Sequence, residues 1–200
     1  PLAGGMQMFH VLELQLMEGQ RIDTVKQCTL QQSFKPLRED LNAMAYGSFI
    51  AELALSLFPE QLPQPEIFDR LLAIFSSFGS RSPRLLALAA GYQLLALAGS
   101  KLEFMHCVHC GRALSETGFF SLPDGGMLCE SCGQEPLPQL AVGVRNFAMR
   151  LEELEWQKPP TFLVKKTELL QTEQILLSCL QQLLGKPLKS LEFIQQLAVV

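Results

Sequence analysis

The sequence predicts a mainly α-helical protein. A helical bundle carries a short N-terminal β-hairpin and a small cysteine-rich module inserted between its third and fourth helices. Three observations support this prediction. Apolar and polar residues alternate near the N-terminus, as in a half-buried strand. From residue 37 onward, apolar residues recur at helical spacing. Between residues 104 and 136 this spacing gives way to two Cys-x-x-Cys pairs.

The composition is that of a folded chain with a sizeable core. Of the 200 residues, 48% are apolar and 18% are charged, which is too apolar for a disordered segment. The net charge is -4 and the pI about 5.4. Since a protein that binds DNA through bulk positive charge is basic overall, a nucleic-acid role requires a local patch or a part of the protein outside this sequence. The chain begins at Pro1 in what resembles the middle of a domain, so we expect upstream sequence to be missing.

Residues 6–30 are predicted to form the hairpin. Leu12, Leu14 and Leu16 alternate with polar residues in the first strand, the period of a half-buried strand. Residues 18–20 supply the turn, and 21–30 form a second extended run. Two strands alone are marginal in water, so we expect this hairpin to need upstream strands or packing onto the rest of the chain.

Apolar spacing predicts three helices before the cysteine-rich module and three after it. Their expected bounds are 37–58, 66–78, 84–98, 142–154, 166–184 and a short last helix that follows Pro187. Gly99 and Gly185 are well placed to end two of them, and Ser190 is the expected N-cap of the last. The buried face of the first helix is expected to comprise Leu37, Leu41, Met44, Ala45, Phe49, Leu53 and Leu57.

The longest apolar stretch, 85–99, is expected to be the central core helix. It contains Gln93 and is flanked by Arg84 and Lys101. It is also shorter than the ~20 residues needed to span a bilayer. We therefore expect no association with membranes.

The cysteines indicate a metal site rather than a disulfide framework, and a reducing cytoplasm. Each Cys-x-x-Cys pair places two thiolates on one tight turn, at about the separation that one tetrahedral ion demands. Gly111 and Gly133 follow the pairs, where the turn needs an unusual backbone angle and close approach. The intervening stretch, from Gly118 to Gly126, has the pattern of a strand, a turn and a strand. The sequence thus predicts a structural zinc ribbon whose ligands are Cys107, Cys110, Cys129 and Cys132.

Other uses of these cysteines are weaker hypotheses. Two redox dithiols are disfavoured because neither pair lies in a thioredoxin-type βαβ pattern. A catalytic zinc would keep an open coordination position and a nearby general base, and a zinc deaminase would carry an HxE element that this sequence lacks. His106 and His109 could replace a cysteine as ligand, but with four cysteines present they are expected to be bystanders.

No residue is predicted to be catalytic, because the sequence contains no phosphate-binding loop, dinucleotide fingerprint or nucleophile elbow. The densest basic stretch near the hairpin could contact DNA phosphates or be ordinary surface; it comprises Arg21, Lys26, Lys35 and Arg38. The same two interpretations hold for two lysine pairs, Lys165 with Lys166 and Lys186 with Lys189.

Four further side chains in apolar surroundings have a structural interpretation. Phe119 and Phe120 could stack on bases, but packing beneath the zinc site is the more ordinary role. Cys28 and Cys179 are expected to behave as small core residues.

Taken in order, four stretches make the sequence resemble the RecO recombination-mediator family. Gly4–Gly5 with Met8–Phe9 and the leucine-rich strand resemble the last part of that family's OB-fold. Residues 34–41, with Tyr46 and Glu52–Leu53, resemble the start of that family's helical domain. The two cysteine pairs, with Gly118–Phe120 and Gly125–Gly126, resemble its zinc ribbon. Residues 185–193 resemble its C-terminal motif.

The resemblance implies a division of the chain. Residues 1–30 would be the C-terminal part of an OB-fold that lacks its first strands. Residues 31–103 and 137–200 would be the helical domain, and 104–136 the zinc ribbon.

The resemblance also implies a function without catalytic turnover. Family members bind single- and double-stranded DNA, anneal complementary strands, and act with RecR to load RecA onto DNA coated by single-stranded-DNA-binding protein (SSB). The helical domain would receive the C-terminal tail of SSB. The location implied is cytoplasmic and nucleoid-associated. Two alternatives remain: a zinc-stabilised helical interaction scaffold without DNA affinity, and a metalloenzyme.

Overall fold

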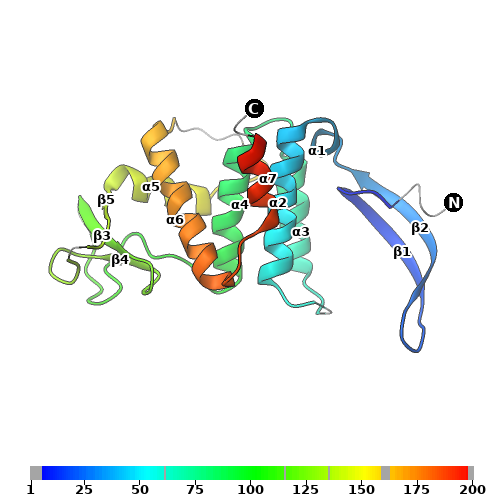
Figure 1. The fold of residues 1–200 in the computed structure, drawn as a ribbon, viewed down its shortest axis with the longest axis horizontal. Helices are drawn as coiled ribbons and strands as arrows, with labels where there is room; N and C mark the ends of the chain where they lie inside the picture. The colour runs from blue at the N-terminus through cyan, green and yellow to red at the C-terminus, as the bar shows by residue number, and fades with distance from the viewer. Residues whose placement is uncertain (1–5, 61, 115, 135, 159–162, 198–200) are drawn as a thin grey trace.

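The protein is elongated, with a helical bundle in the middle, a β-hairpin at one end and a small sheet with the cysteine pairs at the other (Figure 1). The computed structural model describes residues 6–60, 62–114, 116–134, 136–158 and 163–197. The predicted Gly4–Gly5 feature and Pro1 lie outside the described residues. The mainly helical fold class, with a leading hairpin and an inserted small sheet, is confirmed.

Seven helices are described, and their bounds follow the predicted periodicity closely after the first. They are α1 (Pro36–Glu39), α2 (Leu41–Leu57), α3 (Pro65–Ser76), α4 (Pro83–Leu97), α5 (Val142–Glu152), α6 (Lys166–Leu184) and α7 (Lys189–Leu197). Gly99 and Gly185 adopt the left-handed conformation, with φ of 80° and 63°. They follow α4 and α6 as expected, because glycine carries no Cβ penalty there.

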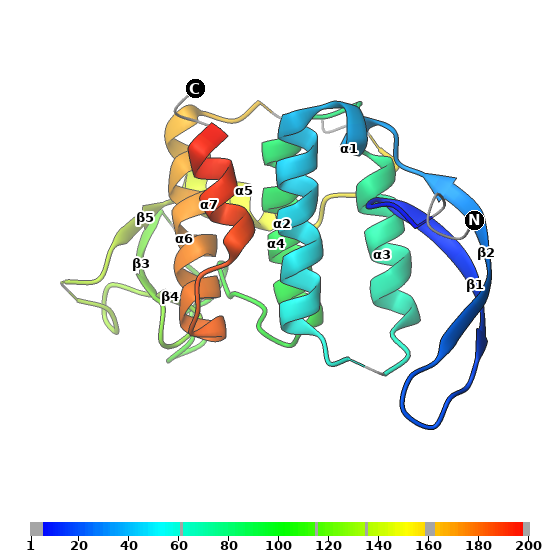
Figure 2. The same cartoon turned by 45° about the vertical axis from the view of Figure 1, so that its right-hand side comes forward.

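Helix α4 is the centre of the bundle, lying between α2 and α6 (Figure 2). All ten residues from Leu86 to Leu95 are buried, so the predicted central core helix is confirmed. Gly91 permits close packing here, since a Cβ at this position would lie 2.4 Å from Cδ2 of Leu176 on α6. Among the described residues, no helix is long and apolar enough to cross a membrane.

One polar side chain, Gln93, is buried within this apolar helix and is fully hydrogen bonded. Its Nε2 donates to the carbonyl oxygens of Leu154 (2.9 Å) and Leu151 (3.3 Å), which end α5. Its Oε1 accepts from Trp156 Nε1 at 2.8 Å and from Arg70 Nη1 at 3.1 Å. Gln93 therefore joins α3, α4 and the segment that follows α5.

The expected continuous helix over 37–58 is wrong, because Asp40 divides it into α1 and α2. Asp40 has extended backbone angles, φ -111° and ψ 122°, and its Oδ1 accepts from Ala43 N at 2.6 Å. It is therefore the N-cap of α2. Leu37 is fully buried as expected, but the break turns Leu41 outward and leaves it 54% exposed.

The hairpin consists of the antiparallel strands β1 (His10–Met17) and β2 (Thr24–Ser33). The turn is longer than expected, and β2 begins at Thr24 rather than at Arg21. Cross-strand pairs place six apolar or small side chains on one face: Leu12 with Leu30, Leu14 with Cys28, and Leu16 with Val25. The predicted alternation is present, and this face is only partly covered by the rest of the chain, since Leu14, Leu16 and Leu30 are 41–55% exposed.

The hairpin is attached to the bundle at its open end. The Phe75 ring on α3 meets the rings of Phe9 and Phe34 edge to face, at centroid distances of 5.8 and 5.6 Å. Gly47 on α2 provides space for the Phe9 ring, because a Cβ there would lie 3.1 Å from it. The far end of the β1–β2 hairpin projects away from the helices (Figure 1).

The second sheet contains β3 (Thr117–Ser121), β4 (Gly126–Leu128) and β5 (Gln139–Ala141) in the order β4-β3-β5, all antiparallel. The first two form the strand–turn–strand expected between the cysteine pairs. β5 leads directly into α5, so this sheet is continuous with the start of a bundle helix.

Helix α7 is held at its first turn by a side chain from another helix. Glu52 on α2 accepts hydrogen bonds from Lys189 N (3.0 Å), Ser190 N (2.8 Å) and Ser190 Oγ (2.6 Å). The expectation that Ser190 is the N-cap is therefore wrong. Ser190 lies inside the helix, and Glu52 supplies the capping oxygens from a distance in sequence.

We expect Glu52→Ala to lower the free energy of unfolding by about 2 kcal/mol, since two helix-terminal N–H groups and a hydroxyl lose their acceptor. Urea unfolding of this variant and of wild type measures the difference. Glu60→Ala, which removes an exposed carboxylate from the loop after α2, is the control. Equal stability of all three proteins would show that Glu52 contributes nothing.

The effect of Glu52 also has a defined pH dependence. Burial raises the pKa of its carboxyl, but hydrogen bonds from Ser190 and from the backbone of Ser190 and Lys189 outweigh burial, and the pKa is lowered overall. The stabilisation is therefore present above the carboxyl's unfolded pKa and is lost as the pH falls through its folded pKa. We expect the stability difference between wild type and Glu52→Ala to vanish in acid.

Candidate metal centre and nucleic-acid interface

The four cysteines of the two Cys-x-x-Cys pairs converge on one point. Each offers one Sγ atom, and all four Sγ atoms lie within 4.8 Å of one another. The Sγ atoms of Cys110 and Cys129, from different pairs, are 3.7 Å apart. A tetrahedral zinc with Zn–S bonds of about 2.3 Å places its sulfurs ~3.8 Å apart. The cluster thus has the composition and the size of a four-cysteine zinc site.

Each pair is shaped by a tight backbone turn that ends in glycine. Gly111 N donates to Cys107 O at 2.8 Å, and Gly133 N donates to Cys129 O at 2.7 Å. Gly111 has φ 71°, which a side chain would strain. A Cβ at Gly133 would lie 2.7 Å from the Phe119 ring. The two glycines therefore serve the two expected purposes, one each.

Glu103 fixes the approach to the first pair. Its Oε1 accepts from the backbone N–H groups of Met105 (2.7 Å) and His106 (3.0 Å). Burial raises the pKa of its carboxyl, but these two bonds outweigh burial and the pKa is lowered. An ionised Glu103 thus orders the segment that leads into Cys107.

Local hydrogen bonds favour thiolates on the buried side of the cluster. Burial raises the pKa of Cys107, but backbone N–H groups of Cys129, Cys110 and His109 outweigh burial and lower the pKa to about 6. Hydrogen bonds with Cys129 and Cys110 raise the pKa of Cys132 to about 12. A divalent ion would displace the remaining thiol protons, because the thiolate is the metal-binding form.

The two histidines near the cluster have other partners. His106 Nδ1 lies 3.7 Å from Glu103 Oε1, and His109 Nε2 lies 3.4 Å from Asp124 Oδ1. Within the described residues, the four-member ligand group comprises cysteines only. Four protein thiolates would leave a tetrahedral ion no open position, which is the ligand pattern of structural zinc sites.

The two phenylalanines between the pairs are buried, 8% and 4% exposed, and therefore present no stacking surface to bases. Phe119 packs in a small cluster with Cys107, Leu128 and Cys129, as the structural interpretation expected. Phe120 reaches the bundle core instead, where its ring stacks on Phe104 at 6.1 Å.

The small sheet is also tied to the bundle by a buried cation. Arg145 on α5 is 3% exposed and donates to the carbonyl oxygens of Phe104 (3.3 Å) and Glu116 (3.1 Å). Burial lowers the pKa of its guanidinium. The backbone at Phe104 and at Glu116 is thus held against α5.

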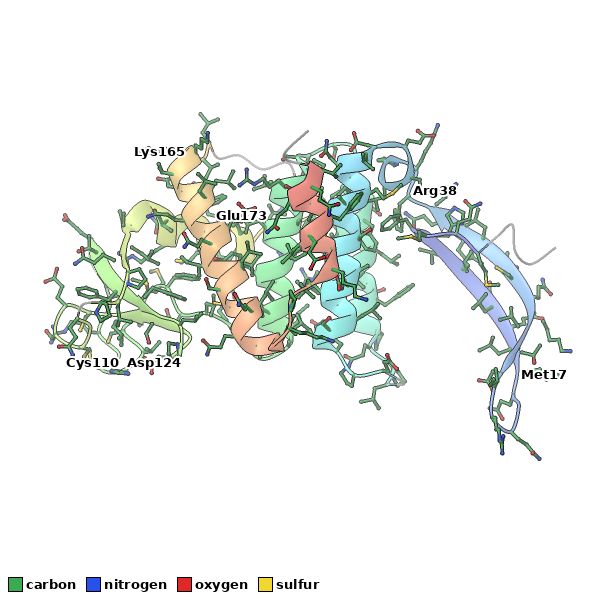
Figure 3. The ribbon with its side chains drawn as sticks, in the orientation of Figure 1. Met17, Arg38, Cys110, Asp124, Lys165 and Glu173 are labelled. Carbon is green, nitrogen blue, oxygen red and sulfur yellow. The ribbon has the colours of Figure 1, made fainter. Side chains whose placement is uncertain are left out.

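The four basic residues expected to contact DNA are all exposed but form two groups. Arg21 and Lys26 flank the far end of the hairpin, where Met17 pairs with Thr24 (Figure 3). Lys35 and Arg38 lie at its open end, beside α1. Lys35 Nζ is 3.6 Å from Glu39, and Arg38 Nη1 contacts His10 Nε2 at 2.7 Å and Ser33 Oγ at 3.3 Å. The structure therefore does not assemble one compact basic cluster from them.

The remaining cysteines behave differently from each other. Cys179 on α6 is buried, and burial raises its pKa to about 11, as expected of a core residue. Cys28 lies on the exposed face of the hairpin and is only partly buried, so the expectation that it is a core residue is wrong.

Three contacts of functional interest had no sequence signal: Arg38 with His10, Glu103 with the first cysteine turn, and Glu52 with α7. Each joins residues by a hydrogen bond that follows no motif or period. Only the tertiary fold brings Arg38 and Glu52 to their partners, which are 28 and 137–138 residues away.

Comparison with known proteins identifies the family. Residues 38–192 match the family model described as "Recombination protein O C terminal". The chain is 35% identical over 129 residues to the DNA repair protein RecO of Pelotomaculum thermopropionicum, covering 64% of this chain and 50% of that protein. It is 35% identical over 138 residues to that of Symbiobacterium thermophilum, covering 66% and 54%.

A longer alignment, 26% identical over 197 residues, relates it to the DNA repair protein RecO of Desulforamulus reducens and covers 97% of this chain and 77% of that protein. The chain spans about half the length of the first two of these relatives. The family model covers most of the chain, including the first helices, both cysteine pairs and the start of α7. The chain therefore belongs to the RecO family.

Proposed function

We propose that this chain acts in DNA repair as part of a recombination mediator. In this role it binds single-stranded and double-stranded DNA, anneals complementary strands, and helps RecA load onto SSB-coated DNA together with RecR. The observation that carries the proposal is the family match over 38–192, which relates the chain to proteins named DNA repair protein RecO. A cytoplasmic, nucleoid-associated location and the absence of catalytic turnover belong to the same proposal.

In this proposal the chain has three parts with different tasks. Residues 1–30 are the C-terminal part of an OB-fold, whose remaining strands would cover the exposed apolar face toward the far end of the hairpin, at Leu14 and Leu16. Residues 31–103 and 137–200 are the helical domain, which binds protein partners. Residues 104–136 are the zinc ribbon, in which zinc on Cys107, Cys110, Cys129 and Cys132 supplies folding energy to a module with a very small core of its own.

The helical domain has a cavity that suits an acidic, apolar peptide, such as the C-terminal tail of SSB that we propose it binds. About 220 Å³ in volume, it lies between α2, α4, α6 and α7. Its lining is mainly apolar but also includes Tyr46, Arg84, Glu173 and Gln195. Arg84 Nε donates to Glu173 Oε1 at 3.2 Å. A carboxylate of the tail would exchange with Glu173 on this guanidinium while an apolar side chain enters the cavity.

The test is strand annealing in the presence of SSB. The zinc-loaded chain, alone and joined to an upstream OB-fold, is added to two complementary SSB-coated oligonucleotides, and duplex formation is followed by fluorescence. We expect faster pairing without nucleotide hydrolysis. Unchanged pairing with both proteins contradicts the proposal. Anisotropy of a labelled SSB tail peptide, titrated with the chain and with Arg84→Gln, tests the partner site separately.

A second candidate is a zinc-stabilised interaction scaffold without DNA affinity. The net charge of -4 favours it, because non-specific DNA binding depends on released counterions and hence on basic groups. This candidate predicts tail-peptide binding together with no salt-dependent DNA binding, even when the OB-fold is complete.

A further inference from the structure

An apolar groove of about 470 Å³ lies where the hairpin meets the bundle. We name it the junction groove; its lining includes Met8, Phe9, Phe34, Phe68 and Phe75. It is therefore formed by the start of β1 with the two residues before it, the residue after β2, one face of α3 and Ala51 of α2. Two of these side chains are open to solvent, since Phe68 is 52% exposed and Met8 64% exposed.

Aromatic rings that pack against one another form the floor of the junction groove. Phe75 packs edge to face against both Phe9 and Phe34, and Phe34 N donates to Phe9 O at 3.1 Å. Among the described residues other than glycine, Phe9 is the one with a positive φ, 59°. Such a conformation is strained for a residue with a side chain and persists where its surroundings over-determine it, often at functional sites.

The guanidinium of Arg38 lies at the rim of this groove. His10 lines the groove, and its Nε2 is 2.7 Å from Arg38 Nη1. The same guanidinium nitrogen donates to Ser33 Oγ at 3.3 Å. Neither of these partners is a carboxylate, so neither neutralises the positive charge that Arg38 presents on an exposed surface. The groove thus combines aromatic walls with a cation at its edge.

We infer that the junction groove binds one unstacked base of a single-stranded nucleic acid, with the adjoining phosphate held by Arg38. This inference rests on the proposed DNA-binding function and assigns it a place on this chain. Base stacking on aromatic side chains is strong and independent of sequence, and four phenylalanines line this groove. Arg38 supplies the bidentate donors that phosphate prefers.

The experiment compares two probes that differ only in their bases. One is fluorescein-labelled dT20; the other is an abasic strand of the same length, which keeps the phosphates. Anisotropy titrations use the zinc-loaded chain and the variants Phe68→Ala and Arg38→Gln. The matched controls are Phe193→Ala, an exposed phenylalanine on α7, and Arg112→Gln, an exposed arginine just after the first cysteine pair.

We expect Phe68→Ala to weaken dT20 binding by about tenfold and to leave the affinity for the abasic strand unchanged. Arg38→Gln should weaken both probes and lower the salt slope by about 0.7. Both control variants should bind as wild type does. Phe68 and Arg38 both lie at exposed positions, so we expect both variants to fold, and a far-UV circular dichroism spectrum of each checks this directly.

The outcomes separate this inference from the function on which it rests. If wild type binds dT20 and Phe68→Ala binds it equally well, the junction groove is not the base-binding site. The DNA-binding proposal itself then stands. Equal losses on dT20 and on the abasic strand also overturn base insertion. No saturable binding of dT20 by the wild-type chain overturns DNA binding by this chain itself. Capture of an acidic apolar peptide that depends on Phe68, without dT20 binding, would assign the groove to a protein partner instead.

Discussion

Cys107→Ser and Cys129→Ser are each expected to abolish stoichiometric zinc binding and to unfold the zinc ribbon. Structural zinc contributes about 10 kcal/mol or more in small modules, whereas the ribbon's own apolar cluster contains few side chains. Elemental analysis of the purified proteins gives the zinc content directly. Proteolysis or hydrogen exchange over 104–136 reports the loss of structure, and lower solubility should accompany it.

The helical bundle should remain folded in these variants but become less stable. Phe104, Phe120 and Met127 come from the ribbon and its approach yet belong to the main core, so their loss removes one apolar layer. We expect a loss of about 3 kcal/mol and a fall in melting temperature of about 6–12 °C, with helical circular dichroism retained.

Cys28→Ser is the control for both substitutions, because Cys28 lies on the hairpin outside the four-thiol cluster. It should keep one zinc per chain and the wild-type melting temperature. Wild-type zinc content and stability in Cys107→Ser or Cys129→Ser would show that the cluster is not the metal site.

Gln93→Leu is expected to lower the free energy of unfolding by about 4 kcal/mol, although leucine is the commoner residue in such a helix. The substitution leaves the indole N–H of Trp156 and the carbonyl of Leu154 buried without their partner. Each such group costs about 1–3 kcal/mol. The added apolar area cannot compensate, because Gln93 is already 4% exposed and its volume is close to that of leucine.

Chemical unfolding with tryptophan fluorescence measures this effect well, since Trp156 is the only tryptophan of the chain and lies in the affected network. Gln171→Leu, an exposed position on α6, makes the same chemical change where no buried partner is lost. If the two variants were equally stable, the Gln93 network would be without energetic consequence.

Much of the fold could be predicted because its determinants are local. The period of 3.6 in 166–184 predicted the observed bounds of α6, and glycine after α4 and α6 predicted where they end. The four-thiol cluster was predictable for the same reason. Two cysteines on one turn are already close, so the fold needs only to bring two turns together, and the spacing between the pairs leaves room for one hairpin.

Other features depended on residues that the chain brings together from a distance. The break at Asp40 is a local exception, because its carboxylate accepts from Ala43 N only three residues on, although the apolar period continues through it. Ser190 resembled an N-cap, but Glu52 on α2 takes that role. The four basic residues near the hairpin lie in two groups, because the hairpin extends away from α1 (Figure 3).

The sequence by itself determined the helices, the leading hairpin and the pairing of the four thiols on two turns, since propensity, period and spacing act within a few residues. Only the tertiary structure decided which polar groups are buried with partners and which apolar faces remain open. Gln93 and Glu52 acquire their roles from helices far along the chain, and the junction groove exists only because the packed hairpin and α3 place Phe9 and Phe68 around one space. Burial and hydrogen bonding over such distances depend on packing, which no local pattern records.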